Sequence, residues 1–316
     1  MATSESAIIY LFTRTSLHVG SGGSVGAIDL PIIRERHTAF PIIPGSALKG
    51  VFADEWIEIN ENTYQSNDAE IKEHIYQRNT EGKDLFGTEE KGGMLQFSEA
   101  KLLLFPIRSP KGCFGWITCP LILKRYCRDT GQTILDSIQL SDNKALFKKE
   151  SCLCINEGGK EKVILEEYIF EKTQEDSEEI IKAFVNQLPV DLVSIDPIWK
   201  EIGNRLVIVS DSMMSFFTQS ACEIAQHVKI NDKTGTAESG ALFNQENVPS
   251  ETAFYSIVRK GPSRNENSFK PIEVLEKKIK EKNYLFQFGA DAGTGLGYCT
   301  TYLTKTTHKE GESNNG

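Results

Sequence analysis

Glycine interrupts the chain at two places that follow strand-like sequence. Residues 20–26 read GSGGSVG, and residues 289–297 read GADAGTGLG. Glycine adopts backbone conformations that other residues avoid and loses the most entropy in regular structure, so both segments are expected to be loops. The stretches 7–19, 283–288 and 298–304 are rich in β-branched and aromatic residues and predict strands. The fold must therefore contain strands whose connecting loops can turn backbone amides outward.

Helical patterns lie between these strands. Pro44 and Gly45 end an extended segment, and Ser46 is a favourable N-cap for a helix with Leu48 and Phe52 on its apolar face. A second helix is expected at 175–188, and a third begins at Asp211 or Ser212. The apolar positions of the third helix are expected to be Met214, Phe217, Ala221, Ile224 and Val228.

Further strand-like runs occur within 94–128 and at 162–170, 205–210 and 253–259. Strands and helices thus alternate irregularly. This order favours an α+β fold with insertions over a doubly wound parallel sheet.

Three segments are set apart by their composition. Residues 57–91 are polar and weakly periodic, and we expect a helical insertion there. Residues 228–245 predict a β-hairpin with a polar, Gly/Thr-rich tip. We expect residues 1–304 to form one domain containing both insertions, and residues 305–316 to be a disordered tail.

Length and composition limit the class of protein. The chain has 316 residues and seven cysteines, none of them in a CxxC pair. An odd number of cysteines without a secretory signal predicts reduced thiols in the cytoplasm and argues against structural zinc. No apolar run approaches the roughly 20 residues of a membrane-spanning helix, so no membrane partner is expected.

The net charge of −9 excludes a basic coat for nucleic acid but leaves room for a local basic groove. Residues 54–90 carry eleven acids against three bases, and residues 157–180 carry nine against three. These stretches are either solvated faces or protein-docking surfaces. The glycine-rich N-terminal region, by contrast, carries Arg14, Arg34, Arg36 and Lys49.

Backbone amides and positive charge coincide in this region. The start of a helix carries a partial positive charge, and Lys49 lies in the first turn of the helix expected at Ser46. No Walker A or GxGxxG motif is present, so each glycine loop alone is more consistent with a tight turn than with a phosphate cradle. Together the loops and Lys49 favour a polyanionic ligand.

Asp29 is the one acid between residues 6 and 34. It is either a turn cap or ion-pair partner of Arg34 or Arg36, or a general base or metal ligand acting on a phosphodiester. One carboxylate holds a divalent ion weakly, so substrate phosphate and water would complete the shell.

The other ionisable candidates have less local support. His18 ends the first strand, and Glu251 and Tyr255 follow the hairpin. The hairpin itself either packs on its own domain or protrudes as an arm whose apolar residues wedge between bases.

Four segments resemble one protein family. They are TSLHVGSGGSVGAIDLPIIRERHTAFPIIPGSALKG at 15–50, VSDSMMSFFTQSACEIAQHVKINDKTGTAESGALF at 209–243, NVPSETAFYSIV at 247–258 and FGADAGTGLGY at 288–298. Together they resemble the RAMP-superfamily backbone subunit of type III-B CRISPR (Cmr) effector complexes. The resemblance is weakest at 57–91 and 125–200.

The resemblance implies a modified ferredoxin-like, RRM-type palm with a β-hairpin thumb at 228–245. It implies partners: guide RNA, single-stranded target RNA, further copies of the chain in a filament, and other Cmr subunits, including a polymerase-like large subunit and a small helical subunit. It also implies cleavage of guide-complementary target RNA at regular intervals, with a divalent metal ion, Mg or Mn, as cofactor.

The resemblance also assigns roles to residues. Asp29 matches the family's catalytic aspartate and is the implied metal contact, with His18, Glu251 and Tyr255 as supporting candidates. Ile230 and Phe243 would form the thumb wedge. The implied RNA-binding residues are Gly20, Gly22, Gly23, Arg34, Arg36, Ser46, Lys49, Gly293, Thr294, Gly295 and Gly297.

The leading hypothesis is a guide-RNA-binding subunit that cleaves target RNA through attack by the RNA's own 2′-OH, assisted by Asp29. One alternative is a non-cleaving scaffold in the same filament. Another is a metal-independent, guide-processing ribonuclease that uses His18. A nucleotide-hydrolysing enzyme is disfavoured because no phosphate-binding motif is complete.

Overall fold

The computed structural model describes residues 5–23, 26–66, 69–133, 138–173, 177–231, 233–261 and 269–306. Its main sheet is built from β1 Ser6–Thr13, β2 Ile42–Ile43, β5 Leu95–Phe97, β6 Ala100–Ser109, β7 Cys113–Thr118, β12 Leu206–Ile208, β15 Ala253–Lys260, β16 Leu285–Gln287 and β17 Tyr298–Lys305. Within the described residues these nine strands follow the order β12-β7-β6-β15-β1-β17-β16, with β2 beside β6 and β5 beside β15.

The centre of the sheet is β1, which runs antiparallel to both β15 and β17. All eight of its residues, SAIIYLFT, are buried. A strand that is covered on both faces is apolar throughout rather than alternating, as this one is. The two neighbours of β1 lie more than 240 positions away in sequence, so the N-terminal strand closes the palm between late segments.

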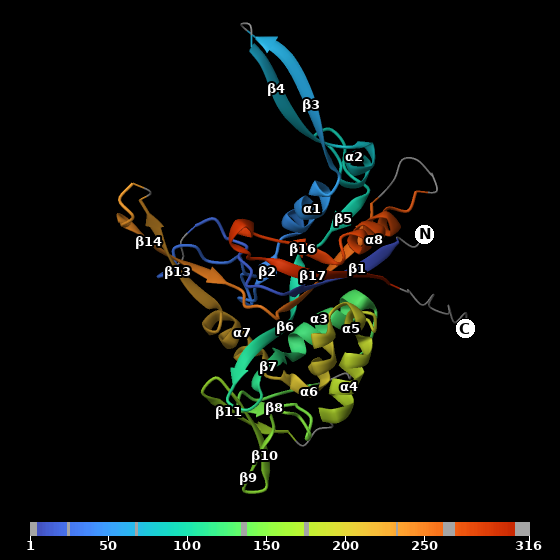
Figure 1. Cartoon of the computed structure of the whole chain (residues 1–316). Helices are drawn as coiled ribbons and strands as arrows, with labels where there is room; N and C mark the ends of the chain where they lie inside the picture. The colour runs from blue at the N-terminus through green and yellow to red at the C-terminus, as the bar shows by residue number, and fades with distance from the viewer. Residues whose placement is uncertain are drawn as a thin grey trace, which may run out of the picture.

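Helices cover both sides of this sheet (Figure 1). In that view α1 and α8 lie next to the upper strands β1, β16 and β17, and α3 to α6 lie lower, next to β6 and β7. The helices are α1 Gly45–Asp54, α2 Thr80–Phe86, α3 Pro120–Thr130, α4 Ser177–Gln187, α5 Leu192–Ile195, α6 Ile202–Arg205, α7 Asp211–Ser220 and α8 Pro271–Glu281, with 3-10 turns η1 Pro197–Glu201 and η2 Ala292–Thr294.

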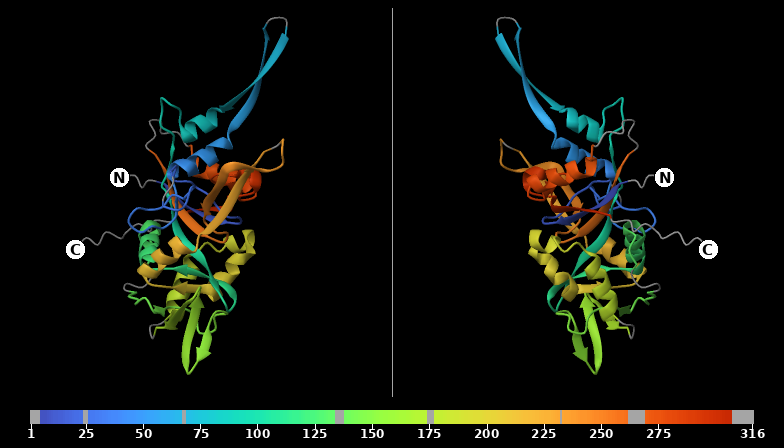
Figure 2. Two further views of the ribbon diagram at one scale, coloured as in Figure 1. Left: turned by 90° about the vertical axis from the view of Figure 1, so that its left-hand side faces the viewer. Right: turned by 90° about the vertical axis from the view of Figure 1, so that its right-hand side faces the viewer.

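Three parts project from this palm. The arm is the hairpin of β3 Ile57–Ser66 and β4 Ala69–Arg78, and the thumb is the hairpin of β13 Glu223–Ile230 and β14 Ala237–Asn247. The small sheet, in the order β8-β11-β10-β9, consists of β8 Lys144–Ala145, β9 Ile155–Glu157, β10 Lys160–Leu165 and β11 Tyr168–Lys172. Figures 1 and 2 show the arm and the small sheet at opposite ends of the molecule, with the thumb between them.

The prediction of a helical insertion at 57–91 is wrong for most of this segment. Residues 57–78 form the arm, in continuous antiparallel register from Ile57↔Arg78 to Ser66↔Ala69, and only α2 is helical. Cross-strand pairing between segments that alternate in polarity outweighed the weak helical periodicity.

The third expected helix is shorter than predicted, and the thumb begins earlier in the sequence than predicted. The helix stops at Ser220, so Ile224 and Val228 belong to β13 and not to a helix face. The thumb therefore spans 223–247 rather than 228–245. The β-branched side chains of Ile224 and Val228 are better suited to a strand than to a helix.

Two strands and one helix expected from the sequence are confirmed. The strands expected at 283–288 and 298–304 pair as β16 and β17, and the helix expected at 175–188 is α4. All seven cysteines are free. Among the described residues, no helix is long and apolar enough to cross a membrane. Most of the expected tail, 307–316, lies outside the described residues.

Candidate functional site at the base of the thumb

Asp29 is exposed and is held by Asn244 of the thumb, 215 residues away in sequence. The Asp29 amide donates to Asn244 Oδ1 at 2.9 Å, and the Asn244 amide donates to Asp29 Oδ2 at 2.9 Å. Asn244 Nδ2 also donates to the Ala27 carbonyl at 3.1 Å, and the Leu30 amide donates to the Asn244 carbonyl. These bonds fix the Asp29 loop while one carboxylate oxygen stays open to a ligand.

The residues that follow Asn244 on β14 anchor the other candidate segments. Gln245 Nε2 donates to the Asp291 carboxylate at 2.8 Å, which ties the 289–297 loop to the thumb. The Glu246 carbonyl accepts from His18 Nδ1 at 2.7 Å. Val248 pairs with Leu17 as an isolated bridge. One short strand therefore brings together three segments from distant parts of the chain.

His18 is buried, with 5% of its surface exposed. Its bond to the Glu246 carbonyl fixes Nδ1 as the protonated nitrogen. A Cβ at Gly20 would lie 3.0 Å from His18 Nε2, so the ring is packed against the first glycine loop. This placement makes His18 a support for the loop backbone and gives it no open path to solvent.

Arg34 is engaged by protein groups rather than by solvent. Its guanidinium donates to Glu246 Oε1 at 2.5 Å and to the carbonyls of Ala39 and Thr218. Glu246 in turn accepts from the Ile32 amide through Oε2 at 3.1 Å. We therefore assign Arg34 to organising the site, and RNA contact by Arg34 stays a prediction.

The first glycine loop is exposed at Gly20, Gly22 and Gly23. Gly20 pairs with Ile32 as an isolated bridge, and Gly22 has a φ of 86°, in the left-handed region that favours glycine. A Cβ at Gly22 or Gly23 would meet no atom within 4 Å. These two positions are open for a large ligand to approach the backbone.

The second glycine loop has two different parts. Gly293 and Thr294 are exposed, Gly295 is half-buried, and nothing crowds the missing side chain at Gly293 or Gly295. Gly297 is buried, and a Cβ there would lie 1.9 Å from the Phe288 carbonyl oxygen. The Gly297 amide donates to Ser16, so this glycine serves close packing and its amide is not available to RNA.

At α1 the N-cap residue is Pro44, not Ser46 as the sequence suggested, and no side chain caps the helix. A Cβ at Gly45, the first residue of the helix, would lie 2.6 Å from the Phe97 carbonyl oxygen, so this position requires glycine. Ser46 is exposed, Lys49 is half-buried, and Arg36 is exposed on the preceding loop. The helix start keeps its unpaired amides and a cation nearby, as an anion site requires.

The thumb presents apolar side chains to solvent on both of its faces. Phe243 is 37% exposed and stacks on His227, with ring centroids 5.2 Å apart. Val228 and Leu242 pair across the other face and are 47% and 67% exposed. Ile230, near the tip, is 49% exposed. The expected wedge residues Ile230 and Phe243 are thus exposed, and Leu242 is more exposed than either.

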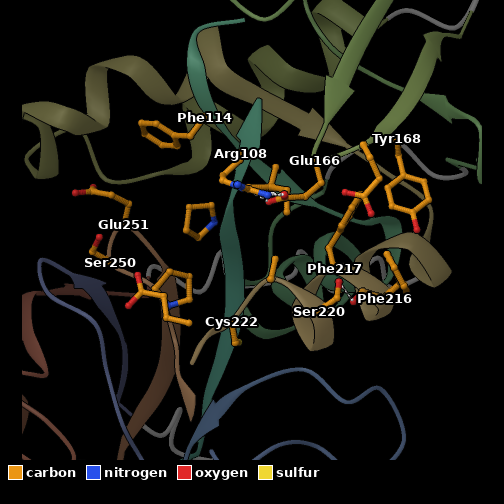
Figure 3. A pocket seen from close by; sticks show the side chains of 16 residues that line it. Arg108, Phe114, Glu166, Tyr168, Phe216, Phe217, Ser220, Cys222, Ser250 and Glu251 are labelled. Carbon is orange, nitrogen blue, oxygen red and sulfur yellow. Dashed lines mark hydrogen bonds and ion pairs between the residues drawn. The ribbon is translucent and has the colours of Figure 1, made fainter. Parts of the chain in front are cut away.

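Glu251 lies in a separate cleft of about 630 Å³ between β6, β7, α7 and the β10–β11 turn (Figure 3). Burial, with a smaller effect from the Asp196 charge, raises the pKa of the Glu251 carboxyl to about 7. Its Oε2 is buried and has no hydrogen-bond partner among the described residues. No hydrogen bond between described residues joins Glu251 to Asp29 or His18.

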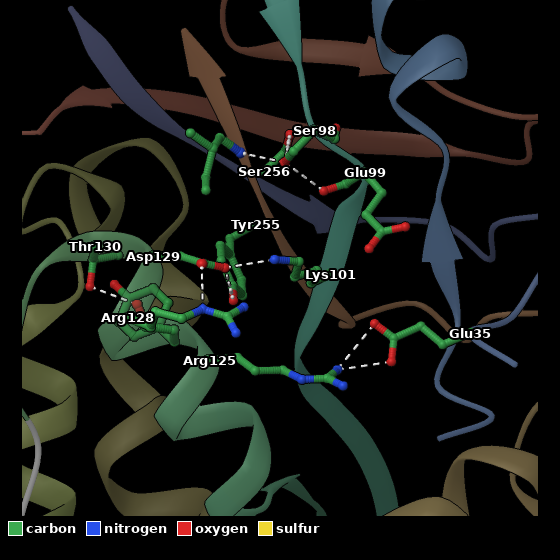
Figure 4. A network of polar contacts seen from close by, with 12 residues as sticks. Glu35, Ser98, Glu99, Lys101, Arg125, Arg128, Asp129, Thr130, Tyr255 and Ser256 are labelled. Carbon is green, nitrogen blue, oxygen red and sulfur yellow. Dashed lines mark hydrogen bonds and ion pairs between the residues drawn. The ribbon is translucent and has the colours of Figure 1, made fainter. Parts of the chain in front are cut away.

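Tyr255 is part of the core and not of the Asp29 loop. It is 1% exposed, and its hydroxyl donates to Asp129 Oδ2 at 3.0 Å, beside the Lys101–Asp129 ion pair (Figure 4). Burial, reinforced by the Asp129 carboxylate, raises the pKa of the phenol well above its usual value. A side chain so deeply placed cannot touch RNA unless the sheet opens, so we drop it from the proposed site.

Metal-ligating side chains do not cluster in the described residues: no group of three His, Cys, Asp or Glu could hold an ion. Asp29 can therefore offer a cation one carboxylate oxygen and little else. Such a site fits a hard divalent cation only when phosphate and water oxygens complete the shell.

The sequence matches the RAMP superfamily over residues 11–300. The chain belongs to the RAMP superfamily. It is 32% identical over 309 residues to the CRISPR system Cmr endoribonuclease Cmr4 of Pyrococcus furiosus, covering 96% of this chain and 97% of that protein. A 39-residue stretch, 11% of this chain and 18% of the relative, is 51% identical to the Cms endoribonuclease Csm3 of Enterococcus italicus.

Solved structures agree with this RAMP assignment at the level of the fold. A crystal structure of oligomeric Cmr4 from P. furiosus superposes with a TM-score of 0.68 at 24% identity, covering 97% of this chain and all of that one. A type III-B Cmr-beta complex bound to cognate target RNA contains a chain with a TM-score of 0.61 at 20% identity, covering 96% and 97%. The expected ferredoxin-like RAMP fold is confirmed.

Sequence analysis missed two residues of this RAMP site, Asn244 and Glu246. Asn244 lies near the end of the expected hairpin and Glu246 directly follows it, and both read as ordinary polar residues of a strand. One signal was available in the sequence: Asn244 and Glu246 are polar residues at the end of an apolar, Gly-rich hairpin. Their partners are more than 200 residues away, so only the fold reveals their roles.

Proposed function

We propose that this chain is a guide-RNA-binding backbone subunit of a type III-B CRISPR effector complex and that it cleaves guide-complementary target RNA. The observation that carries the proposal is the Asp29 loop, fixed to the thumb by Asn244 with its carboxylate exposed. The full-length similarity to a Cmr endoribonuclease supports the same activity.

Binding would use backbone groups rather than base-reading side chains. Open glycines at 22, 23 and 293, together with the start of α1 and Lys49, offer amides and a cation to a phosphate chain. Contacts to phosphate and sugar carry no sequence information, which suits a guide whose sequence varies. Exposed apolar residues of the thumb would unstack the guide–target duplex and displace a nucleotide.

Cleavage would then use the RNA's own 2′-OH. The 2′-oxygen attacks the adjacent phosphorus, the bond from phosphorus to the 5′-oxygen breaks, and the leaving oxygen takes a proton from solvent. Asp29 would assist either by accepting the proton of the 2′-OH or by binding the metal ion, in which case water accepts that proton. The products carry a 2′,3′-cyclic phosphate and a 5′-OH. Much of the rate would come from in-line positioning by the thumb.

Asp29 would be the protein ligand of a divalent ion, Mg²⁺ or Mn²⁺, that arrives with the RNA. When bound, the ion would stabilise negative charge on the attacked phosphate. His18, Glu246 and Arg34 would act indirectly by holding the two loops and β14 in place.

In the assembled complex, copies of this chain would follow one another along the guide, beside the polymerase-like large subunit and the small helical subunit, in the cytoplasm. The burial of His18 disfavours a guide-processing ribonuclease that uses this residue as a general base.

The test is cleavage of a guide-complementary RNA by the reconstituted complex, comparing wild type with Asp29→Asn. We expect regularly spaced cuts that vanish in the variant while target binding persists. Spaced cuts that persist in Asp29→Asn would reject the assignment of this residue, and 5′-phosphate products would reject the mechanism.

A further inference from the structure

The small sheet carries a basic cleft that the proposed function does not use. The cleft has a volume of about 940 Å³ and is lined by Lys144, Lys149, Lys160 and Lys172. Among the described residues, two carboxylates, Glu161 and Glu171, share the lining with these four lysines, which leaves two lysine charges in excess there. In a protein with a net charge of −9, such a place is an exception.

Each of the two carboxylates forms ion pairs with two lysines. Glu171 accepts from Lys144 at 2.8 Å and from Lys160 at 2.9 Å. Glu161 lies 3.1 Å from Lys172 and 3.9 Å from Lys149. Hydrogen bonds from Lys144 and Lys160, together with their charges, lower the pKa of Glu171 to about 2.

The cations are also accessible. The side chains of Lys149 and Lys160 are 72% and 64% exposed, whereas Lys172 is 16% exposed at the back. Gly159 has a φ of 79°, and a Cβ there would meet no atom within 4 Å. The rim of the cleft next to Lys160 is therefore open to a ligand. Asn156 and Ser141 add uncharged polar groups to the lining. Lysines that are spread around one cleft suit an extended anion whose charges are separated along a chain.

We propose that this cleft binds the phosphodiester backbone of RNA, as a second contact outside the thumb site. The inference rests on the proposed function for the identity of the ligand, because RNA is the polyanion that such a subunit meets. The contact would be independent of base sequence and would weaken steeply with salt.

The experiment measures binding of a fluorescein-labelled single-stranded RNA to the full chain by fluorescence polarisation at a series of salt concentrations. The variant is Lys149→Ala/Lys160→Ala. Loss of two phosphate contacts on a single strand lowers the slope of log affinity against log salt by about 1.4, at about 0.7 per contact. Lys149→Arg/Lys160→Arg should keep the wild-type slope.

The matched control is Lys270→Ala/Lys277→Ala on α8, which removes two lysines of similar exposure that are also paired with glutamates. We expect this control to keep the slope. Equal slopes for wild type and the cleft variant would overturn the proposal. A second outcome would also overturn the proposal. If inorganic phosphate or AMP raises the melting temperature of wild type but not of the cleft variant, and the RNA slopes of the two are equal, the cleft binds small phosphates and not RNA.

A third result would point to protein rather than RNA. If the cleft variant keeps its RNA slope but forms smaller oligomers by light scattering, the cleft contacts a second copy of the chain, and the RNA proposal fails. Failure of the proposed function is separate from all of these. It would show as undiminished spaced cleavage by Asp29→Asn, whatever the salt slope of the lysine variant.

Discussion

The Arg34 guanidinium donates to the Glu246 carboxylate at 2.5 Å, and Glu246 lies two residues from the Asn244 that anchors Asp29. The side chains of Arg34 and Glu246 are 18% and 5% exposed. Removing one partner of such a pair leaves a charge without compensation in a place that water hardly reaches.

Glu246→Ala should therefore lower the free energy of unfolding by about 3 kcal/mol, near the low end for a broken buried pair. Urea unfolding of the full chain measures this effect. The double variant Arg34→Met/Glu246→Leu should lose less free energy of unfolding than the single variants Arg34→Met and Glu246→Leu lose together. Additive losses would mean that the two side chains do not interact.

Asn244→Ala should slow target cleavage by about 10- to 100-fold, since a small displacement of a reacting group is costly in rate. RNA affinity should hold, because the amide itself faces the Asp29 loop. Single-turnover cleavage and filter binding separate the two effects. Gln226→Ala, opposite Asn244 on β13 and exposed, is the control and should cleave at the wild-type rate.

Leu242→Ser should reduce cleavage with little change in stability. At 67% exposure the side chain buries little area, so the free energy of unfolding should move by no more than about 0.5 kcal/mol. Val190→Ser, at 84% exposure outside the thumb, is the matched control and should leave cleavage unchanged. Equal cleavage by the two variants would argue against apolar wedging by Leu242.

Glu251 predicts a pH effect on stability. Its carboxyl has a folded-state pKa of about 7, above the ordinary 4.5, so the folded state binds this proton more tightly than the unfolded state. The stabilisation is complete below pH 4.5 and is lost as the pH rises through 7. Melting temperatures between pH 5 and 8 should fall more steeply for wild type than for Glu251→Gln. Parallel curves would place the pKa near its ordinary value.

Metal removal should stop cleavage and spare the fold. Among the described residues no group of three ligating side chains forms a structural metal site, so EDTA should leave the melting temperature of the free chain unchanged. The same chelator should abolish the spaced cuts made by the complex, and added Mg²⁺ should restore them. Cleavage that resists chelation would remove the ion from the mechanism.

The glycine loops and the α+β class could be predicted from the sequence because they follow from local composition and from the order of strand-like and helical segments. The catalytic role of Asp29 rests on the family resemblance and stays a prediction. The arm could not, because its register from Ile57 to Arg78 depends on pairing that weak periodicity does not reveal. The boundary between α7 and β13 was missed because Ile224 and Val228 satisfy a helical spacing as well as an alternating one. Asn244 and Glu246 gain their roles only when β14 meets the N-terminal loops.

Consecutive residues of β14 hold the Asp29 loop, the 289–297 loop and His18. The thumb and the loop that carries the Asp29 carboxylate are therefore joined rigidly within one subunit. In the proposed mechanism, the distance from the displaced nucleotide to the scissile bond would then be set inside that subunit. The number of subunits on the guide would set how many cuts are made, and β14 would set where each cut falls.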